Sequence, residues 1–258
     1  MIPIKTPKEI ERMRAAGRLA GAVIDQVSEI VRPGITTGEV DQFAADLIAR
    51  NDCTSAFLNY RQFPGNICIS INDEVVHGIG GKRRIQYGDI VKLDIGVFHH
   101  GYVGDTATTV AAGAIDPRIR RLLDVTEGSL YIGIRQAFAG NRVGDISAAI
   151  EDEVVANGYN VVREFVGHGV GKKLHEEPQV PNYGKWGSGP KLKPGMTLAI
   201  EPMVNMGTAA VRILQDGWTV VTADARPSAH FEHTVLITNG EPEILTWREK
   251  TLSKLKAK

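Results

Sequence analysis

Residues 88–97 read Gly-Asp-Ile-Val-Lys-Leu-Asp-Ile-Gly-Val, and residues 195–204 read Gly-Met-Thr-Leu-Ala-Ile-Glu-Pro-Met-Val. Each stretch is a mostly apolar run that begins at glycine and carries a carboxylate at its seventh position, Asp94 in the first and Glu201 in the second. Short apolar runs bounded by glycine are typical of buried β-strands. The two stretches therefore predict equivalent strands, 107 positions apart, that each present an acidic side chain.

Other stretches repeat in the same order. Residues 34–41, Gly-Ile-Thr-Thr-Gly-Glu-Val-Asp, resemble residues 140–147, Gly-Asn-Arg-Val-Gly-Asp-Ile-Ser, at an offset of 106. The tetrapeptide His77-Gly78-Ile79-Gly80 resembles His168-Gly169-Val170-Gly171. Two nearly equal offsets in one order indicate an internal duplication. We expect Asp94 to be equivalent to Glu201, and His77 to be equivalent to His168.

Helical patterns accompany both copies. Apolar residues from Ile10 to Val31 recur at alternating spacings of three and four, which places them on one helix face. Thr6-Pro7-Lys8-Glu9 is a capping box with proline at the first helical position, and Arg32-Pro33-Gly34 ends that helix. Asp116-Pro117 opens a helix in the second copy. We predict an α/β (α+β) fold of two similar halves, each with two helices on a twisted antiparallel sheet.

Composition restricts the class of protein. At 258 residues the chain is one large domain or two fused half-domains, and it can bury roughly 70–75% of its unfolded surface. We predict a single domain over 1–258 with halves of about 1–115 and 116–250. The formal net charge of zero does not favour nucleic acid or membrane binding. Two cysteines, no signal-peptide pattern and no apolar run of membrane-spanning length predict a cytoplasmic protein.

Five residues able to ligate metal lie at or beside the ends of apolar runs: Asp94, Asp105, His168, Glu201 and Glu232. Carboxylates with one imidazole suit divalent Mn, Fe, Co or Zn, and this number of carboxylates can bridge two ions. Two such ions can make water a nucleophile at neutral pH and polarise a carbonyl group, so the set predicts a hydrolase.

Each of these residues also has an ordinary explanation. An aspartate at a strand end is usually a turn or capping residue, and a histidine in a loop is usually a hydrogen-bonded surface residue. Asp94 and Glu201, however, would repel each other at matched positions of two facing halves unless a cation lay between them. Phosphate-loop and GxSxG nucleophile motifs are absent from the sequence. Metal chemistry therefore remains the favoured interpretation.

From about Ile4 to Leu245 the chain resembles type I methionine aminopeptidases. The resemblance rests on five separated strings in order, which are Asn-Asp-Glu-Val-Val-His-Gly-Ile at 72–79, GYVGDT at 101–106, GHGVGKKLHEEP at 167–178, AIEPM at 199–203 and FEHTV at 231–235. It implies the pita-bread fold with pseudo-twofold symmetry and a dinuclear metal centre. The implied activity is removal of the initiator methionine from nascent proteins and peptides with a small second residue, by a hydroxide shared between the metal ions.

Carried over by position, the resemblance makes the same five residues the metal ligands, with Asp105 and Glu232 bridging two divalent ions (Co, Mn, Fe, Zn or Ni). It implies that His77 and His175 lie near the scissile bond, and that Glu201 also transfers protons. The implied methionine pocket comprises Tyr60, Phe63, Cys68, Leu174 and Trp218, with Phe57 as a further lining residue. Phe63 stands where the family commonly has tyrosine, and Leu174 where it commonly has phenylalanine.

The resemblance further implies a monomer that acts on polypeptides with N-terminal methionine, contacts the ribosome transiently, and binds neither membranes nor specific nucleic acids. One alternative is a pita-bread peptidase of different specificity, such as Xaa-Pro cleavage. The expectation of no separate N-terminal domain, and the pair Cys68 and Trp218, argue against it. Another alternative is a non-catalytic pita-bread protein that only binds partners. Such proteins generally lose metal ligands, whereas all five are present here.

Overall fold

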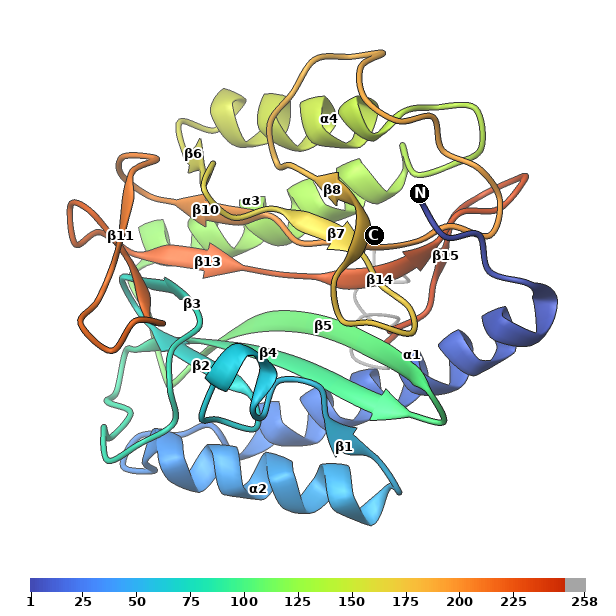
Figure 1. Ribbon diagram of the computed structural model, residues 1–258. Helices are drawn as coiled ribbons and strands as arrows, with labels where there is room; N and C mark the ends of the chain where they lie inside the picture. Colours follow the sequence, from blue (N-terminus) through green and yellow to red (C-terminus); the bar gives the residue numbers. More distant parts are fainter. Residues whose placement is uncertain (249–258) are drawn as a thin grey trace.

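The computed structural model describes residues 1–248, and within them two helix pairs flank the strands (Figure 1). The helices are α1 Pro7–Ile30, α2 Thr37–Arg50, α3 Pro117–Ile134 and α4 Val143–Ala156, with a 3-10 helix η1 at Tyr60–Gln62. Two helices in each predicted half are confirmed. Residues 249–258 of the predicted domain, which include the end of its second half at 249–250, lie outside the described part. No helix within residues 1–248 has the length and apolarity needed to cross a membrane.

The helix ends follow the local signals in the sequence. The Thr6 side chain accepts a hydrogen bond from the Glu9 backbone, and the Glu9 carboxylate accepts one from the Thr6 backbone, which completes the predicted capping box. Proline follows at the first position of α1, where its missing N–H costs nothing. Asp116 caps α3 through the backbone N–H of Arg118. The predicted inner face of α1 is confirmed, because Met13, Gly17, Ala20, Ile24 and Val27 are buried.

Short strands make up most of the remaining regular structure. They are β1 Thr54–Ser55, β2 Cys68–Ile71, β3 Glu74–Val76, β4 Ile90–His99, β5 Tyr102–Ala111, β6 Asn160–Val161, β7 Gly167–Gly169, β8 Glu176–Val180, β9 Thr197–Ile200, β10 Met203–Asn205, β11 Val211–Ile213, β12 Val220–Thr222, β13 Ser228–His230, β14 His233–Leu236 and β15 Glu243–Ile244.

Every named strand pairing is antiparallel, as predicted. In the first half β4 pairs with β1, β2 and β5, and the β4–β5 hairpin joins the runs that carry Asp94 and Asp105. In the second half the order is β15-β14-β9-β7-β8. Two smaller sheets, β13-β10-β6 and β11-β12-β3, complete the set, and in the latter β3 of the first half joins strands of the second.

Strand register tests the predicted equivalences. Asp94 lies in β4, and Glu201 directly follows β9 at the matching position, so their equivalence is consistent with the structure. The predicted equivalence of His77 and His168 is wrong. His168 pairs with Ala199, whereas Ser70 pairs with the residue 107 positions earlier, Lys92. Ser70 is therefore the counterpart of His168.

The core spans both halves. One buried cluster packs α3 and α4 against second-half strands, and another packs α1 and α2 against first-half strands. A third cluster draws on both, because it contains Met13 and Tyr102 from the first half together with Val170 and Leu236 from the second. This shared apolar packing holds the two halves at the distance that the site between them requires.

Candidate metal centre

All five predicted metal ligands meet between the halves. Ligand oxygens of Asp94, Asp105 and Glu232 all lie within 4.8 Å of one another. The Nε2 atom of His168 lies 3.4 Å from Glu201 Oε1 and 3.8 Å from Asp105 Oδ2. The side chains come from the β4–β5 hairpin, from β7, and from the chain just after β9 and just before β14. Residues separated by 138 positions along the chain thus form one cluster.

The electrostatics of this cluster favour a cation. Burial raises the pKa of Asp94 to about 7. Burial, with neighbouring carboxylates adding to it, raises the pKa values of Asp105, Glu201 and Glu232 well above their ordinary range. Burial lowers the pKa of His168 to about 3, so this imidazole is neutral and able to ligate. Divalent ions fit these residues, because positive charge removes the repulsion that raises the carboxyl pKa values.

Two buried carboxylate oxygens strengthen the fit. Within the described residues, Asp105 Oδ1 and Glu232 Oε1 have no hydrogen-bond partner. Asp105 is 3% exposed and Glu232 is 2% exposed, so water reaches neither side chain freely. Buried carboxylate oxygens without a donor carry a large desolvation cost. A metal ion is the partner that such oxygens accept most readily in a site of this composition.

The backbone around the ligands is bonded across the two halves. The Thr234 hydroxyl donates to the Asp105 carbonyl, at 2.7 Å, and accepts from the Asp105 N–H, at 3.3 Å. The Thr106 hydroxyl donates to the Glu232 carbonyl at 2.8 Å, and the Glu232 N–H donates to the Ala107 carbonyl at 3.0 Å. These bonds fix β5 against β14 and against Glu232, which directly precedes it. They therefore set how far apart the Asp105 and Glu232 carboxylates lie.

A cavity of about 800 Å³ opens onto the cluster. Its wall includes the whole predicted pocket, which comprises Phe57, Tyr60, Phe63, Cys68, Leu174 and Trp218. The rings of Phe63 and Trp218 meet edge to face with centroids 5.1 Å apart. Burial raises the pKa of the Cys68 thiol well above its usual value, so the thiol is neutral and apolar in character. The cavity thus combines an apolar chamber with an acidic, metal-binding floor.

The two predicted histidines near the scissile bond also line this cavity. Burial lowers the pKa of His77 to about 4, and the ring lies edge-on to Trp218 at a centroid distance of 6.1 Å. His175 Nδ1 lies 2.8 Å from the Tyr60 hydroxyl, and its ring centroid lies 4.2 Å from that of His168. Burial, and then Arg61, lower the pKa of His175. Both imidazoles therefore line the cavity in their neutral form.

The sequence profile of metallopeptidase family M24 matches residues 11–239. The chain belongs to metallopeptidase family M24. The methionine aminopeptidase of Clostridium perfringens is 49% identical over 246 residues, which cover 95% of this chain and 99% of that protein. The Escherichia coli methionine aminopeptidase is 44% identical over 250 residues, which cover 96% of this chain and 95% of that protein. The predicted family resemblance is confirmed.

Solved structures agree with this M24 assignment. The crystal structure of methionine aminopeptidase from Thermotoga maritima has a TM-score of 0.94 at 44% identity and covers 96% of this chain and 100% of that one. Prolidase from Pyrococcus furiosus has a TM-score of 0.76 at 24% identity, and the matched part spans 66% of its chain. The latter likeness concerns the fold alone. The predicted pita-bread fold is confirmed.

One residue of this M24 site escaped the sequence reasoning. His230 is 1% exposed, and its Nε2 lies 3.8 Å from Glu201 Oε2. Within the described residues neither of its ring nitrogens has a hydrogen-bond partner, and burial lowers its pKa to about 3. The available signal was the cluster of His230, Glu232 and His233 inside an apolar run. Of these, His233 contacts Tyr131 and Thr246, so it has a packing role.

Other residues line the cavity without having been predicted. They include Val76, Phe165 and Met203, and the Phe165 ring lies edge-on to His77 with centroids 5.4 Å apart. Nothing distinguishes these residues in the sequence from ordinary core residues, because an apolar side chain in a strand or loop reads the same whether it faces a core or a cavity. Only the tertiary structure reveals their place in the wall.

Proposed function

We propose that this protein is a methionine aminopeptidase, a metal-dependent hydrolase that removes N-terminal methionine from nascent polypeptides and peptides and prefers a small second residue. The observation that carries the proposal is the cluster of buried carboxylates and His168 at the floor of an apolar cavity. Relatives at 44–49% identity over nearly the whole chain bear the name methionine aminopeptidase, which supports the same activity.

The metal-binding role falls to Asp94, Asp105, His168, Glu201 and Glu232. These residues would hold two divalent ions, drawn from Co, Mn, Fe, Zn and Ni, with Asp105 and Glu232 shared between the two. Divalent ions bound there supply Lewis acidity, which polarises a peptide carbonyl and lowers the pKa of water towards neutrality. The partnerless oxygens of Asp105 and Glu232 support this assignment.

The methionine side chain would occupy the chamber formed by Tyr60, Phe63, Cys68, Leu174 and Trp218. An unbranched thioether adapts to an irregular apolar pocket and makes favourable sulfur–aromatic contacts. The edge-to-face pair of Phe63 and Trp218 offers such ring surfaces. Leucine at position 174 keeps the wall apolar while giving it a different shape from one built with an aromatic ring.

The histidines and Glu201 would handle the substrate and its protons. In the tautomer in which Tyr60 donates to Nδ1 of His175, the ring would carry its proton on Nε2 and would donate it to the oxyanion that develops on the scissile carbonyl. His77 would contact the scissile amide or the following residue. Glu201 would take a proton from the attacking water and pass it to the leaving nitrogen.

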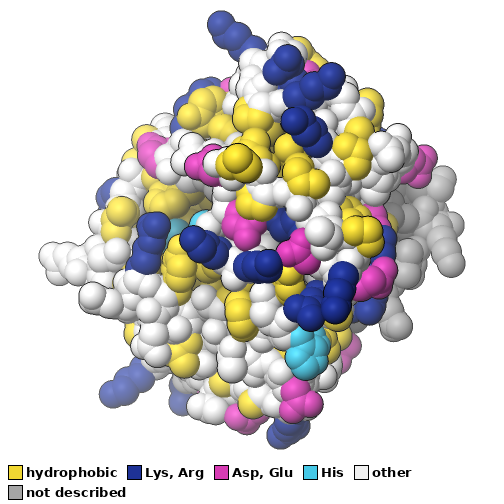
Figure 2. Space-filling model, turned by 45° about the vertical axis from the view of Figure 1, so that its right-hand side comes forward, with side chains coloured by type: hydrophobic (Ala, Val, Ile, Leu, Met, Phe, Trp, Pro, Cys, Tyr) yellow, Lys and Arg dark blue, Asp and Glu magenta, His cyan; other side chains and the backbone are white. Residues whose placement is uncertain are grey.

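We also propose that the protein works as a cytoplasmic monomer with transient ribosome contact, as the family resemblance implies. The face in Figure 2 carries basic, acidic and hydrophobic side chains, with Lys and Arg side chains grouped near its top and in a row across its middle. This mixture accords with a formal net charge of zero and with recognition of substrate by the cavity.

The test is peptide hydrolysis by protein freed of metal and reconstituted ion by ion. Chelated protein should not cleave a Met-Ala-Ser peptide, and Mn, Co, Fe, Zn or Ni should restore cleavage. Full activity in the chelator, or a preference for Ala-Pro over Met-Ala substrates, would contradict the proposal. Elemental analysis of the purified chain separates an enzyme from a pita-bread protein that only binds partners, because the latter should hold no divalent ion.

A variant pair tests the histidine assignment. His175→Ala should lower kcat by roughly 10²–10³-fold, the usual effect of losing one oxyanion donor, while metal content stays at the wild-type level. His100→Ala removes a histidine from the exposed turn between β4 and β5 and should leave kcat unchanged. Wild-type turnover by His175→Ala would remove this residue from the mechanism.

A further inference from the structure

A buried ion pair lies directly beside the His175 turn. The Nζ atom of Lys5 lies 2.7 Å from Glu176 Oε2, with side chains only 5% and 8% exposed. Lys5 precedes the N-cap of α1, whereas Glu176 begins β8 immediately after His175. Two charges are costly to remove from water unless each has a close partner. A pair held this deeply therefore ties the N-terminal segment firmly to the second half.

Glu176 uses its second oxygen to close the turn that carries His175. Oε1 accepts a hydrogen bond from the Lys173 backbone N–H at 3.2 Å. One carboxylate thus holds the start of the turn through Oε1 and binds Lys5 through Oε2. Gly171 leaves the space that this arrangement needs, because a Cβ there would lie 2.6 and 2.7 Å from the two carboxylate oxygens and 2.7 Å from Lys5 Cε.

The backbone of the N-terminal segment is held as well. The Lys5 N–H donates to the Gly195 carbonyl at 2.8 Å, in the turn before β9. Lys5 is therefore fixed at its main chain and at its ammonium group, both times to the second half. On the other side of the turn, the Tyr60 hydroxyl holds His175 Nδ1. The imidazole is located by its own hydrogen bond and by the closed turn below it.

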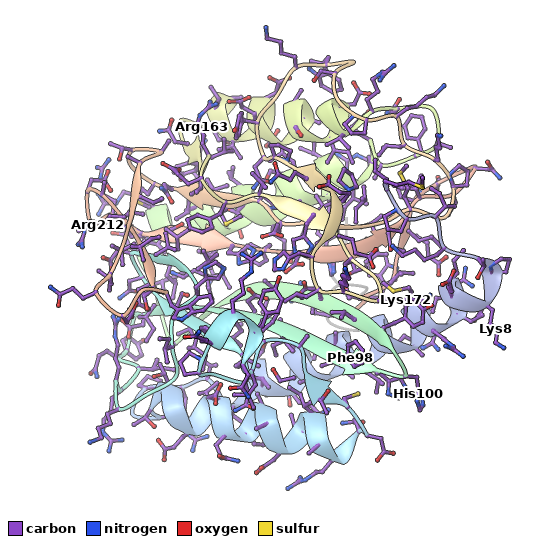
Figure 3. All side chains as sticks on the ribbon, viewed as in Figure 1. Lys8, Phe98, His100, Arg163, Lys172 and Arg212 are labelled. Carbon is purple, nitrogen blue, oxygen red and sulfur yellow. The ribbon has the colours of Figure 1, made fainter. Side chains whose placement is uncertain are left out.

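A neighbouring ion pair joins the same segments at the surface. Lys172 Nζ lies 2.8 Å from Glu9 Oε1, but the Lys172 side chain is 66% exposed. Figure 3 shows Lys172 beside the first turns of α1, on which Lys8 is labelled. Exposed pairs contribute little because water screens them and long side chains lose rotamer freedom. Lys172 thus provides a matched comparison for Lys5, since it has the same residue type and joins the same two segments.

We propose that the Lys5–Glu176 ion pair is a positioning device that holds the His175 imidazole against the metal centre. The inference rests on the proposed function of His175 and extends it to Lys5 in the N-terminal segment, which also places Met1 and Pro3 in the wall of the cavity. Lys5 and Glu176 act through the turn and touch no reacting atom. Loss of the ammonium frees one end of the carboxylate, so the turn relaxes and the imidazole samples positions away from the scissile carbonyl.

The test compares Lys5→Met with Lys172→Met in the full chain loaded with Mn. Misplacement of a catalytic group by about 1 Å costs on the order of 10²-fold, so Lys5→Met should lower kcat by about 10- to 100-fold with KM little changed. Lys172→Met should keep wild-type kcat. Equal kcat values for Lys5→Met and the wild type would overturn the proposal.

A double variant separates positioning from folding. Lys5→Met leaves Glu176 charged and unpaired, so the protein also loses stability, whereas Lys5→Met with Glu176→Gln removes both charges and should recover it. The positioning role requires kcat to stay low in this double variant, because the Lys5–Glu176 ion pair is still absent. Recovery of kcat in step with the midpoint of urea unfolding would assign the pair to stability alone.

A readout that needs no turnover keeps this inference distinct from the proposed function. In the chain loaded with diamagnetic Zn in place of Mn, the imidazole ¹⁵N signals of His175, assigned through His175→Ala, should shift or broaden in Lys5→Met and stay unchanged in Lys172→Met. Unchanged His175 signals in Lys5→Met would overturn the positioning role, even if the protein cleaved methionine peptides as proposed. Absence of methionine release by the wild type would overturn the proposed function. Altered His175 signals in Lys5→Met would still support the positioning role of the Lys5–Glu176 ion pair.

Discussion

Replacing Gly104 by alanine should force α1 away from β5, next to the metal ligand Asp105. A Cβ atom at position 104 would lie 2.5 Å from the carbonyl carbon of Ala16 and 2.8 Å from the Gly17 nitrogen, and closer still to the Ala16 oxygen. All three are backbone atoms in the middle of α1, so no side chain can rotate to make room. Favourable contacts between carbon atoms are about 3.5–4.0 Å long. One of the two elements must therefore move by about 1 Å.

The size of the effect follows from this overlap. Overpacking of a well-packed interior costs about 1–3 kcal/mol, and a clash with fixed backbone belongs at the upper end of that range, about 3 kcal/mol. Domains are stable by only about 5–15 kcal/mol, so the loss should be easily measured. Because Asp105 is the next residue in β5, the same shift should move a metal ligand. Displacement by about 1 Å can cost on the order of 10²-fold in turnover.

Urea unfolding and methionine-peptide turnover would measure both effects. The matched control is Gly128→Ala in α3, where a Cβ meets no atom within 4 Å. Alanine there should stabilise the protein by up to about 1 kcal/mol through its higher helix propensity. The reasoning is refuted if Gly104→Ala unfolds at the same urea concentration as the wild type, or if the two glycine variants lose equal stability.

Three further predictions concern the carboxylate cluster through Asp94, the apolar pocket through Trp218, and the hydrogen bonds that Asp41 makes to residues 66 and 67. Burial raises the pKa of Asp94 from 3.8 to about 7, so the folded metal-free protein binds this proton more tightly than the unfolded chain does. The contribution of this bound proton to the free energy of unfolding is complete below pH 4 and declines by about 1.4 kcal/mol per pH unit up to pH 7. The free energy of unfolding of the metal-free wild type minus that of Asp94→Asn should therefore fall over this range. A constant difference between pH 5 and pH 7 in urea titrations would disprove the prediction. Trp218→Ala removes the ring that packs on Phe63. This variant should raise KM for methionine peptides by roughly 10-fold or more, because removal of one large aromatic side chain from a pocket costs at least about 1.4 kcal/mol of binding free energy. An unchanged KM would show that the methionine side chain binds elsewhere. The Asp41 carboxylate accepts hydrogen bonds from two backbone N–H groups and from the Asn66 side-chain amide. Asp41→Ala should therefore destabilise the protein by about 2–3 kcal/mol, measured by urea unfolding. A loss under about 0.5 kcal/mol would show that water replaces these bonds.

Several features could be predicted from the sequence because their causes are local. The capping box of Thr6 and Glu9 needs only residues three apart, and proline at position 7 acts on its own backbone. The equivalent runs that carry Asp94 and Glu201 show their burial by composition. The carboxylates were recognisable as one site because an acidic group beside buried strand residues needs a partner, whatever the details of the fold.

The tertiary structure alone decided how distant segments meet. It made Ser70, and not His77, the counterpart of His168, because strand register depends on pairing across the sheet and not on a short matching string. It brought His230 to Glu201 and joined Lys5 to Glu176, contacts that span 29 and 171 positions of the chain. Spacing along a sequence carries no information on such pairs, since their geometry is set by the packing of whole elements around a shared core. The sequence therefore determined which chemical groups are available, and the packing of the two halves determined which of them act together.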